Sequence, residues 1–340
     1  MADISCDIVV IGAGVLGLSV AAELTARGHG VCVVDPGRQN ASSVAAGMIA
    51  PTFESLLDGA DAERAALLRD AAALWPAFAA RAGLTLDQTP AEWRGSDAVG
   101  VAEALTRLGF SAEADGDVVR AESDVRIDAE TALATLRAGL GAALFTAEAD
   151  QVERTSEGWR VSTAAGEIIA PQLVMATGTA PSLQGLPDRI ADLIARIEPI
   201  AGQIGRSGSA LTDRVVRGVG GYVTPTRGGS LIGATMAHGS RDPAPDGAAS
   251  ARLVEVAMRL SGGEGPGEIE WRGGVRGATA DGLPLAGPVG GGLHLALAPR
   301  RNGWLLGPLV GRIVADGIEG RQRGPHAAAL DPLRSTLPVD

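Results

Sequence analysis

Three glycines near the N-terminus have the spacing that a phosphate-binding turn requires. Gly12, Gly14 and Gly17 form a GxGxxG pattern, which occurs only once in the 340 residues. The first glycine permits a tight turn out of a strand, the second lets the backbone approach a pyrophosphate, and the third lets a helix pack closely on the strand. Asp35 follows about 20 residues later and can accept a hydrogen bond from a ribose hydroxyl. Together they predict a dinucleotide site, and the carboxylate disfavours a cofactor with a 2′-phosphate.

The segments around these residues have the periods of a strand, a helix and a second strand. The apolar run 8–11 ends at the first glycine, and helical spacing then places Leu16, Val20 and Leu24 on one face. A second apolar run, 31–34, ends at the acid. A helix that begins at the glycines offers free N–H groups and a positive dipole end to phosphates. The order of these elements supports the dinucleotide site over the alternative, an ordinary buried βαβ unit.

Composition and charge disfavour several classes of protein and partner. The formal net charge of −11 would repel nucleic acid and anionic membranes, so we expect neither as a partner. Cys6 and Cys32 have no CxxC or metal-ligand spacing, and the four histidines form no metal or triad pattern, so we expect no metal. No uncharged apolar stretch approaches the roughly 20 residues of a membrane span. The start of the chain leaves no room for a signal peptide, so we expect a soluble, cytoplasmic protein.

The rest of the chain alternates between helical and strand patterns, without a repeat or a long linker. We expect helices at 61–82, 97–109, 128–140, 251–260 and 302–320. Short strands are expected within 151–175, antiparallel strands within 196–240, and a further strand at 292–298. Loops are expected at 111–123 and 271–288, and a weakly ordered tail over about the last 20 residues.

Several segments together resemble one family. They are DIVVIGAGVLGLSVAAEL at 7–24, AAGMIAP at 45–51, IEPIAGQ at 197–203, the pair GGYVTP and LIGAT, and the stretches VRGATADGLPLAGP and RNGWLLGPLVGRIVADGI, which lie between 275 and 318. They extend over nearly the whole chain. Through them the sequence resembles the D-amino acid oxidase superfamily of FAD enzymes, and within it is most similar to glycine oxidase of thiamine biosynthesis.

The resemblance implies an α/β fold with two interleaved domains. One is an FAD-binding, Rossmann-like domain with a doubly wound, mostly parallel sheet, and the other is an α+β substrate domain with an antiparallel sheet. We assign residues 1–80, 124–190 and 271–325 to the discontinuous FAD-binding domain, and residues 81–123 and 191–270 to the substrate domain. The implied cofactor is FAD, bound without a covalent link because neither cysteine lies near the expected flavin ring.

The same resemblance assigns residues to the flavin. Ala45, Ala46, Gly47 and Met48 are expected to line the ring, and Thr177 and Gly178 form a further small-residue turn at the cofactor. Asn302 and Gly303 are expected to begin the last helix, with its N-terminus toward the N1–C2=O edge of the flavin. A helix dipole there would stabilise the negative charge of the reduced ring.

Three side chains are implied for the substrate. Arg276 corresponds to the family's substrate arginine, whose guanidinium fork suits a carboxylate because two parallel hydrogen bonds fix its orientation. Tyr222, the only tyrosine, is expected to donate a second hydrogen bond, although packing on a sheet is the alternative. Arg301 is expected at the pocket mouth, with a structural role as the alternative. The family commonly has Pro where this chain has Gly277, and region 84–127 is shorter than in the family.

The implied activity is oxidative deamination of a small amino acid or amine, such as glycine, sarcosine or a small D-amino acid. Hydride passes to flavin N5, the imine hydrolyses, and oxygen reoxidises the flavin with release of hydrogen peroxide. Two alternatives stay open: a dehydrogenase that passes electrons to a quinone or partner subunit, and a flavin-bound subunit without turnover. A tRNA-modifying relative is disfavoured by the net charge of −11. The five tryptophans suit a core or a subunit contact, so a homo-oligomer also stays open.

Overall fold

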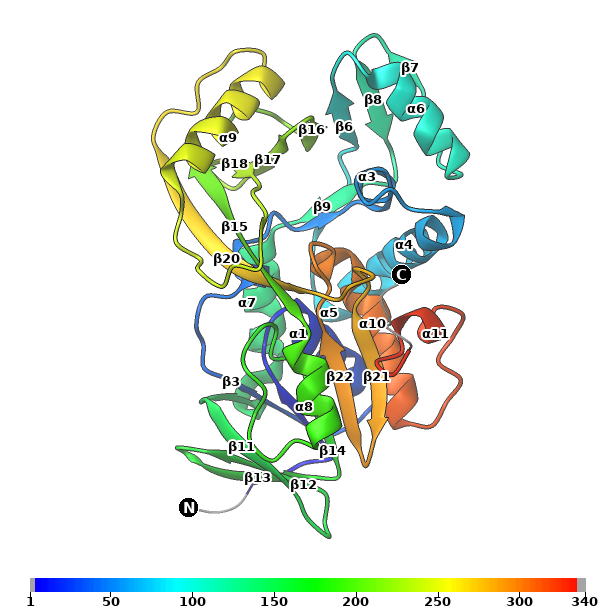
Figure 1. Ribbon diagram of the computed structural model, residues 1–340, viewed down its shortest axis with the longest axis vertical. Coiled ribbons are helices and arrows are strands. Elements are labelled where there is room, and N and C mark those ends of the chain that lie inside the picture. The colour runs from blue at the N-terminus through cyan, green and yellow to red at the C-terminus, as the bar shows by residue number, and fades with distance from the viewer. Residues whose placement is uncertain (1–3, 335–340) are drawn as a thin grey trace.

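The computed structural model describes residues 4–334, and its lower half in Figure 1 is built on one six-stranded sheet. The strands lie in the order β10 (Leu144–Thr146), β3 (Val31–Asp35), β2 (Ile8–Ile11), β14 (Gln172–Met175), β22 (Leu293–Leu297) and β21 (Leu285–Gly290). The first five run parallel to their neighbours, and β21 forms an antiparallel pair with β22 at one edge. The strand that leads into the glycine turn, β2, is therefore central.

Side chains of β2 alternate between two apolar cores on opposite faces of this sheet. Ile8 and Val10 pack in the core that contains helices α1 (Val15–Ala26), α7 (Ala129–Leu140) and α10 (Gly303–Ile318). Val9 and Ile11 pack on the other face, against helix α8 (Asp188–Ala195) and a second sheet. The order of that sheet is β1 (Ile4–Ser5), β13 (Gly166–Ala170), β12 (Trp159–Thr163) and β11 (Ala149–Arg154). Burial on both faces explains why residues 8–11 are all apolar.

Helices α1 and α10 lie in close contact because one of them presents a row of glycines. Gly303, Gly307 and Gly311 recur every four residues and so share one face of α10. A Cβ atom would lie 3.1 Å from Val15 Cγ1 at the first of these positions. At the second it would lie 2.7 Å from Ser19 Oγ, and at the third 2.8 Å from Ser19 O. The missing side chains bring the N-termini of both helices to the same end of the sheet.

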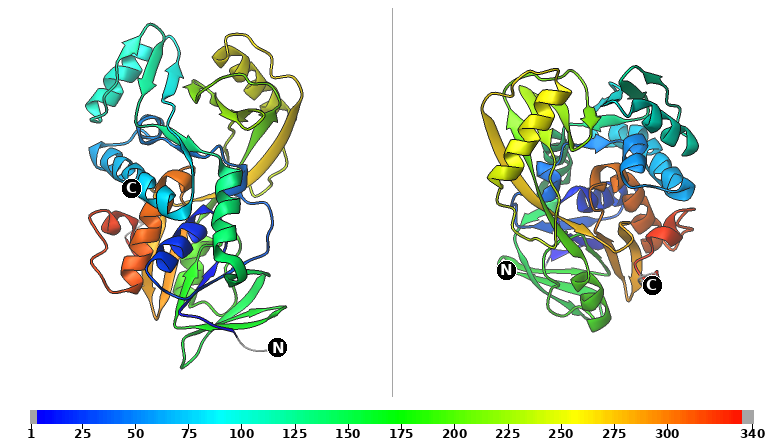
Figure 2. Two further views of the ribbon diagram at one scale, coloured as in Figure 1. Left: turned by 180° about the vertical axis from the view of Figure 1, so that it is seen from behind. Right: turned by 45° about the horizontal axis from the view of Figure 1, so that its top comes forward.

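A larger, mainly antiparallel sheet forms the upper half of the molecule (Figure 1). Its order is β19 (Ala237–His238), β15 (Glu198–Ser207), β18 (Gly229–Gly233), β17 (Gly221–Thr226), β16 (Val216–Gly218), β6 (Ala91–Arg94), β8 (Val118–Ala121) and β7 (Ala114–Asp115), and β20 (Ile269–Ala278) pairs along β15. Helices α9 (Gly247–Leu260) and α6 (Ala98–Arg107) pack on separate parts of it, as both views of Figure 2 show.

Shorter elements complete the structure. A three-stranded sheet has the order β4 (Met48–Ile49), β9 (Val125–Ile127) and β5 (Leu86–Asp87). The remaining helices are α2 (Ala41–Val44), α3 (Pro51–Leu57), α4 (Ala62–Ala73), α5 (Trp75–Ala82), α11 (Ala327–Leu330) and a 3₁₀ turn at Gly141–Ala143. Over residues 4–334, no helix is long and apolar enough to cross a membrane.

The structure confirms the predicted α/β fold and differs from the predicted elements at several places. The helix expected at 61–82 is two helices, α4 and α5, which meet at Leu74 just before Pro76. Strands β7 and β8 occupy the expected loop 111–123. Helices α3 and α8 were not expected, and the last residues of the predicted tail, 335–340, lie outside the described part.

The largest difference concerns residues 271–288, which were expected to be loop-rich. They contain most of β20 and the start of β21. The glycines of β20 reflect close packing: a Cβ at Gly273 would lie 1.8 Å from Pro243 O, and one at Gly277 would lie 2.8 Å from Ile197. Because β20 pairs with β15, residues 271–278 belong to the upper sheet. The division into two domains, which gives these residues to the FAD-binding domain, stays a prediction.

Candidate functional site

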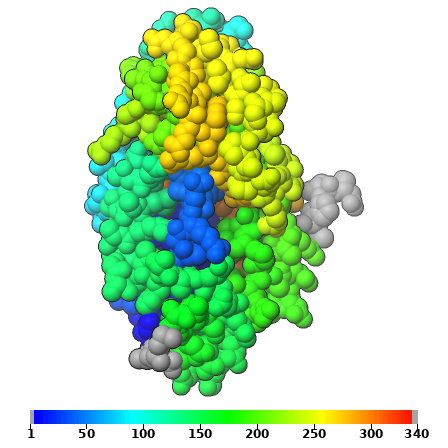
Figure 3. Space-filling model, turned by 90° about the vertical axis from the view of Figure 1, so that its left-hand side faces the viewer, coloured from blue at the N-terminus to red at the C-terminus, as the bar shows by residue number. Residues whose placement is uncertain are grey.

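A cavity of about 450 Å³ lies at the carboxyl ends of the central parallel strands. Its lining comes mainly from within five segments, 11–16, 34–45, 176–183, 273–277 and 296–304. The first two segments leave β2 and β3, the third follows β14, and the last two are the end of β20 and the turn before α10. Figure 3 shows the segment after β3 in blue, exposed between the two halves. Open α/β sheets bind ligands at this edge.

The glycine turn forms one wall of the cavity. Gly12 has a φ of +108°, and a Cβ there would lie 2.3 Å from Ala176 O. A Cβ at Gly17 would lie 2.0 Å from Gly12 O, so this position holds helix α1 against the turn. Gly14 faces the cavity as the N-cap of α1 and offers no side-chain cap. Ser42 Oγ accepts a hydrogen bond from the Val15 N–H at 3.0 Å, and the site thereby gains a hydroxyl that the sequence did not identify.

Asp35 lies at the cavity wall, where it joins three parts of the site. Its carboxylate accepts hydrogen bonds from the Ala13 N–H at 2.7 Å and the Gly37 N–H at 2.8 Å. Arg137 Nη2, from helix α7, donates to the same carboxylate at 3.1 Å. The acid therefore fixes the glycine turn as well as facing the cavity. Arg137 was not among the predicted residues, because the sequence gives no sign of which helix face reaches β3.

The residues expected at the flavin divide into two groups. Ala45, Thr177, Gly178 and Gly303 line the cavity, whereas Ala46, Gly47, Met48 and Asn302 lie behind its wall. Ala46 packs in an apolar cluster, and a Cβ at Gly47 would lie 1.9 Å from Ile127 O. Met48 Sδ accepts a hydrogen bond from Arg217 Nη2 at 2.8 Å, and Asn302 Nδ2 donates to Asp58 Oδ2 at 3.3 Å.

Two helix N-termini meet at this cavity. Helix α1 contributes Gly14, Val15 and Leu16 to the lining, and α10 contributes Gly303 and Trp304. Neither N-cap residue forms a side-chain cap, and in α1 the Val15 N–H donates to Ser42 Oγ. The other N–H groups of both first turns have no acceptor within their helix. The buried Thr177 Oγ1 also has no hydrogen-bond partner among the described residues. Free donors and two positive dipole ends suit a ligand that has phosphates and an electron-accepting ring, as FAD does.

The turn before α10 has an uncommon backbone. Ala298 has a φ of +57° and Arg300 a φ of +51°, in the left-handed region that non-glycine residues rarely adopt. The Arg300 N–H donates to Gly277 O at 2.8 Å, and Ala278 pairs with Pro299. These bonds tie the turn to the end of β20. Such backbone strain is often found at functional sites.

Arg276 lies on β20 and faces the cavity without an acidic partner. Its Nη1 donates to Thr235 O at 3.2 Å, and within residues 4–334 it forms no salt bridge. Burial lowers the pKa of this guanidinium from its ordinary value. An arginine that is desolvated but unpaired is poorly satisfied in the free protein, so it is a favourable partner for a carboxylate brought by a ligand.

Tyr222 lies on β17, near the same region but outside the cavity lining. Its ring crosses the backbone of Gly233, where a Cβ would lie 2.3 Å from the tyrosine hydroxyl. Burial raises the pKa of the phenol, while the charge of Arg276 acts to lower it. The hydroxyl therefore keeps its proton at neutral pH and remains a hydrogen-bond donor.

Arg301 also lines the cavity, but its surroundings differ from those of Arg276. Arg301 Nε donates to Glu54 Oε2 at 2.5 Å, and its Nη2 lies 2.8 Å from Asp58 Oδ1. Glu54 also accepts a hydrogen bond from Arg217 Nη2 at 2.7 Å. Arg301 is thus neutralised by two buried acids, which favours the structural alternative for this residue over an open position at the pocket mouth.

Helix α3, which contains Glu54 and ends just before Asp58, was not predicted from the sequence. The buried Asp124 carboxylate holds its N-terminus by accepting hydrogen bonds from the Thr52 N–H at 2.7 Å and the Phe53 N–H at 2.9 Å. Glu54 and Asp58 are four residues apart, so the helix presents both on one side. That spacing, in the segment that directly follows AAGMIAP, is the signal by which the sequence could have indicated them.

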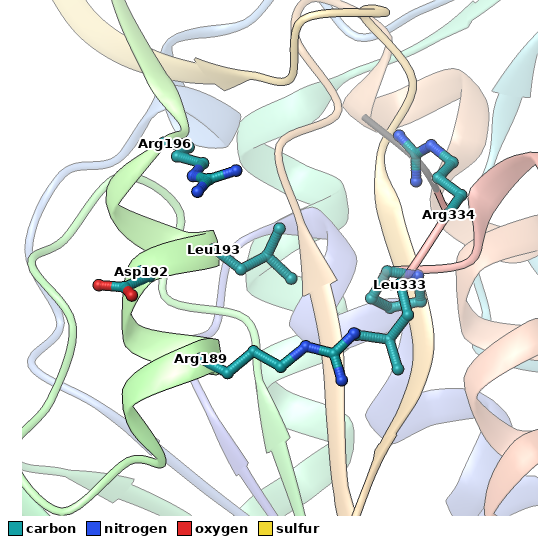
Figure 4. A pocket seen from close by; sticks show the side chains of 7 residues that line it. Arg189, Asp192, Leu193, Arg196, Leu333 and Arg334 are labelled. Atoms are coloured by element: carbon teal, nitrogen blue, oxygen red, sulfur yellow. The ribbon is translucent and has the colours of Figure 1, made fainter. Parts of the chain in front are cut away.

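Other candidate groups lie away from the cavity. His238 is exposed and pairs with Glu198 at 3.0 Å. No group of three acids, cysteines or histidines within residues 4–334 is placed to hold a metal ion. Figure 4 shows a second hollow of about 410 Å³ between α8 and the segment 332–334, with Arg189 and Arg196 around it. This hollow contains none of the predicted site residues.

Comparisons with known proteins agree with this geometry. Residues 7–317 match the family described as FAD dependent oxidoreductase. The chain is 30% identical to a glycine oxidase from Geobacillus kaustophilus (strain HTA426), over 93% of this chain and 93% of that protein. It is also 30% identical to the tRNA 5-methylaminomethyl-2-thiouridine biosynthesis bifunctional protein MnmC from Caulobacter sp. (strain K31), over 91% of this chain. The chain spans only 54% of the length of that relative.

Solved structures show the same fold. The crystal structure of glycine oxidase from Geobacillus kaustophilus has a TM-score of 0.79 at 24% identity and covers 97% of this chain and 99% of that one. Glycine oxidase from Bacillus cereus ATCC 14579 has a TM-score of 0.80 at 22% identity and covers 98% of this chain and 100% of that one. With the family match and the cavity at the glycine turn, the chain belongs to the FAD-dependent oxidoreductases of the D-amino acid oxidase type, and its cofactor is FAD.

Proposed function

We propose that the protein oxidises the carbon–nitrogen bond of a small amino acid, with glycine and sarcosine favoured over larger D-amino acids and with oxygen as the electron acceptor. The observation that carries this proposal is Arg276, a half-buried arginine that faces the cavity and lacks an acidic partner in the described chain. A substrate with a carboxylate beside its amine supplies the missing charge.

In this proposal the protein's own residues bind and orient the substrate. Arg276 forms two parallel hydrogen bonds with the substrate carboxylate, and the Tyr222 hydroxyl adds a third. When bound, FAD takes up the two electrons lost as the amine becomes an imine, and oxygen then receives them to give hydrogen peroxide. Water hydrolyses the released imine to an oxo acid and ammonia, or methylamine in the case of sarcosine.

The carboxylates nearest the site do not offer a free general base. Although burial acts to raise the pKa of Glu54, the guanidiniums of Arg217 and Arg301 hold it below its ordinary value. Asp35 is held by two backbone N–H groups and Arg137. We therefore infer that the substrate reacts as the neutral amine and that the protein contributes orientation and charge placement.

A tRNA substrate is the second candidate that the comparisons raise, because MnmC is as similar to the chain as glycine oxidase is. The formal net charge of −11 argues against it, since a net negative protein repels a polyanion. The charge favours a free small molecule.

The test is anaerobic mixing of the FAD-loaded protein with glycine, sarcosine, D-alanine and D-proline, followed by the flavin absorbance. Bleaching by glycine or sarcosine, with fast recovery and hydrogen peroxide on admission of oxygen, is expected. Bleaching with slow recovery would indicate a dehydrogenase that uses another acceptor. A D-amino acid preferred in kcat/KM by more than about 100-fold would contradict the small-substrate assignment, because one or two methylenes contribute less. Flavin that no amine bleaches would refute the proposed activity.

A further inference from the structure

A buried cluster of charged side chains joins helix α3 to the turn before α10, and the proposed reaction gives this cluster no role. Glu54, which is 7% exposed, accepts hydrogen bonds from Arg217 Nη2 at 2.7 Å and Arg301 Nε at 2.5 Å. One helical turn further on, the Asp58 carboxylate lies 2.8 Å from Arg301 Nη2 and 2.7 Å from Arg300 Nη1. The side chain of Arg217 is only 4% exposed, so its charge depends on this cluster.

The arginines at the cavity fall into two classes. Arg276 has a backbone carbonyl as its hydrogen-bond acceptor, whereas Arg301 is shared between two acids. The two lie close together: after burial and Tyr222, the charge of Arg301 contributes to the shift in the pKa of Arg276. The charge of Glu54 acts on Arg276 as well. Glu54 on α3 therefore acts on both Arg276 and Arg301, while Asp58 and Glu148 pair with the other two arginines of the lining, Arg300 and Arg38.

We propose that Glu54 is a positioning residue that sets the charge of the substrate pocket. It neutralises Arg217 and Arg301, while Asp58 pairs with Arg300 and Glu148 with Arg38. Arg276 is then the cavity arginine that has no acidic partner in the described chain. The pocket then selects amines with one carboxylate over amines with two. This inference rests on the proposed function, because it takes Arg276 as the group that binds the substrate carboxylate.

A second anion must compete with the buried acid for the N–H donors of a paired arginine. A guanidinium that already shares its donors with a buried acid gains little from a second anion, since the old bonds must be broken first. With Glu54 made neutral, Arg217 loses its acidic partner and Arg301 keeps only Asp58, so both arginines become better partners for a second carboxylate. Two unit charges a few ångströms apart, at an effective dielectric of about 20, change a binding constant by tenfold or more.

The experiment uses the FAD-loaded protein and two non-reacting probes, acetate with one carboxylate and malonate with two. The change in the flavin absorbance spectrum gives the Kd of each probe. For Glu54→Gln we expect the ratio of acetate Kd to malonate Kd to rise by about tenfold or more above that of the wild type. The kcat/KM for iminodiacetate should rise relative to that for sarcosine, because iminodiacetate carries a second carboxylate.

Two further variants separate charge from structure. Glu54→Asp keeps the negative charge and should keep a selectivity near that of the wild type. Glu23→Gln is the matched control, because Glu23 also pairs with two arginines, Arg27 and Arg81, but lies on the C-terminal half of α1 and does not line the cavity. It should leave the ratio unchanged.

A selectivity ratio in Glu54→Gln equal to that of the wild type would overturn the inference, as would an equal gain in Glu23→Gln. Should Glu54→Gln not fold, the wild type still decides: malonate bound more than about 30-fold tighter than acetate would show that a second guanidinium is already available. The acetate Kd of Arg276→Met tests the proposed function separately. If Arg276 does not bind the substrate carboxylate, this Kd equals that of the wild type.

Discussion

Replacing Arg276 with methionine keeps most of the side-chain volume and removes the guanidinium that faces the cavity. The variant loses two charge-assisted hydrogen bonds to the substrate carboxylate, each of which contributes about 1.5–3 kcal/mol. We therefore expect kcat/KM for glycine or sarcosine to fall by roughly two to four orders of magnitude, at about 1.4 kcal/mol for each factor of ten. Arg276→Lys keeps the charge without the fork and should recover only a small part of the loss.

The stability of the fold should change little on this substitution. In the free protein Arg276 donates to Thr235 O and has no acidic partner in residues 4–334. The loss of that bond is offset by the removal of a charge whose pKa is already lowered by burial, so the free energy of unfolding should change by no more than about 1 kcal/mol. The visible spectrum of bound FAD should be retained.

The assay is steady-state oxidation followed by hydrogen peroxide release, with thermal unfolding measured on the same samples. Arg272→Met is the matched control, because Arg272 lies on the same strand, pairs with Glu130 and Glu270, and does not line the cavity. It should keep its kcat/KM. The assignment is refuted if Arg276→Met retains kcat/KM within about threefold of the wild type, or if Arg276→Lys restores it fully.

Two further predictions concern the cofactor and the response to acid. FAD should leave the protein on acid precipitation and stay in the supernatant, because neither Cys6 nor Cys32 lies in the cavity; yellow pellets would show a covalent bond. Burial lowers the pKa of His294 to about 4 from an ordinary value of 6.5, so the unfolded chain binds this proton more readily and stability falls as the pH drops through this interval. The loss should be roughly 2 kcal/mol at pH 5, measured by urea unfolding, and His294→Gln should remove it; an identical pH profile in the variant would contradict this.

The sequence predicted the parts of the fold that local patterns determine. The strand, glycine turn and helix at residues 8–26 have periods of their own, and the glycines have backbone angles and contacts that any side chain would disturb. Asp128, the N-cap of α7, is also predictable from the local pattern, since its side chain accepts a hydrogen bond from the Thr131 N–H three residues later. These features depend on neighbours in the chain.

What the sequence did not predict depends on partners that are far apart in the chain. The glycines of β20 suggest a loop from the sequence alone, because their contacts with Pro243 and Ile197 arise only in the folded sheet. The role of Arg301 depends on Glu54 and Asp58, which lie more than 200 residues away in a helix too short to show a clear period. A residue pattern identifies a charged group more easily than it identifies the group that neutralises it.

The strained turn at 298–300 has a thermodynamic consequence. It bonds to the end of β20 through Gly277 O and leads directly into α10, so one short hydrogen-bonded connection joins Arg276 to the N-terminus of α10. A ligand that fixes one end of this connection reduces the entropy that a second ligand must lose at the other end. Because such coupling is reciprocal, a carboxylate in the pocket tightens FAD by the same factor by which FAD tightens the carboxylate. Substrate supply would then help to keep the protein in its FAD-loaded form.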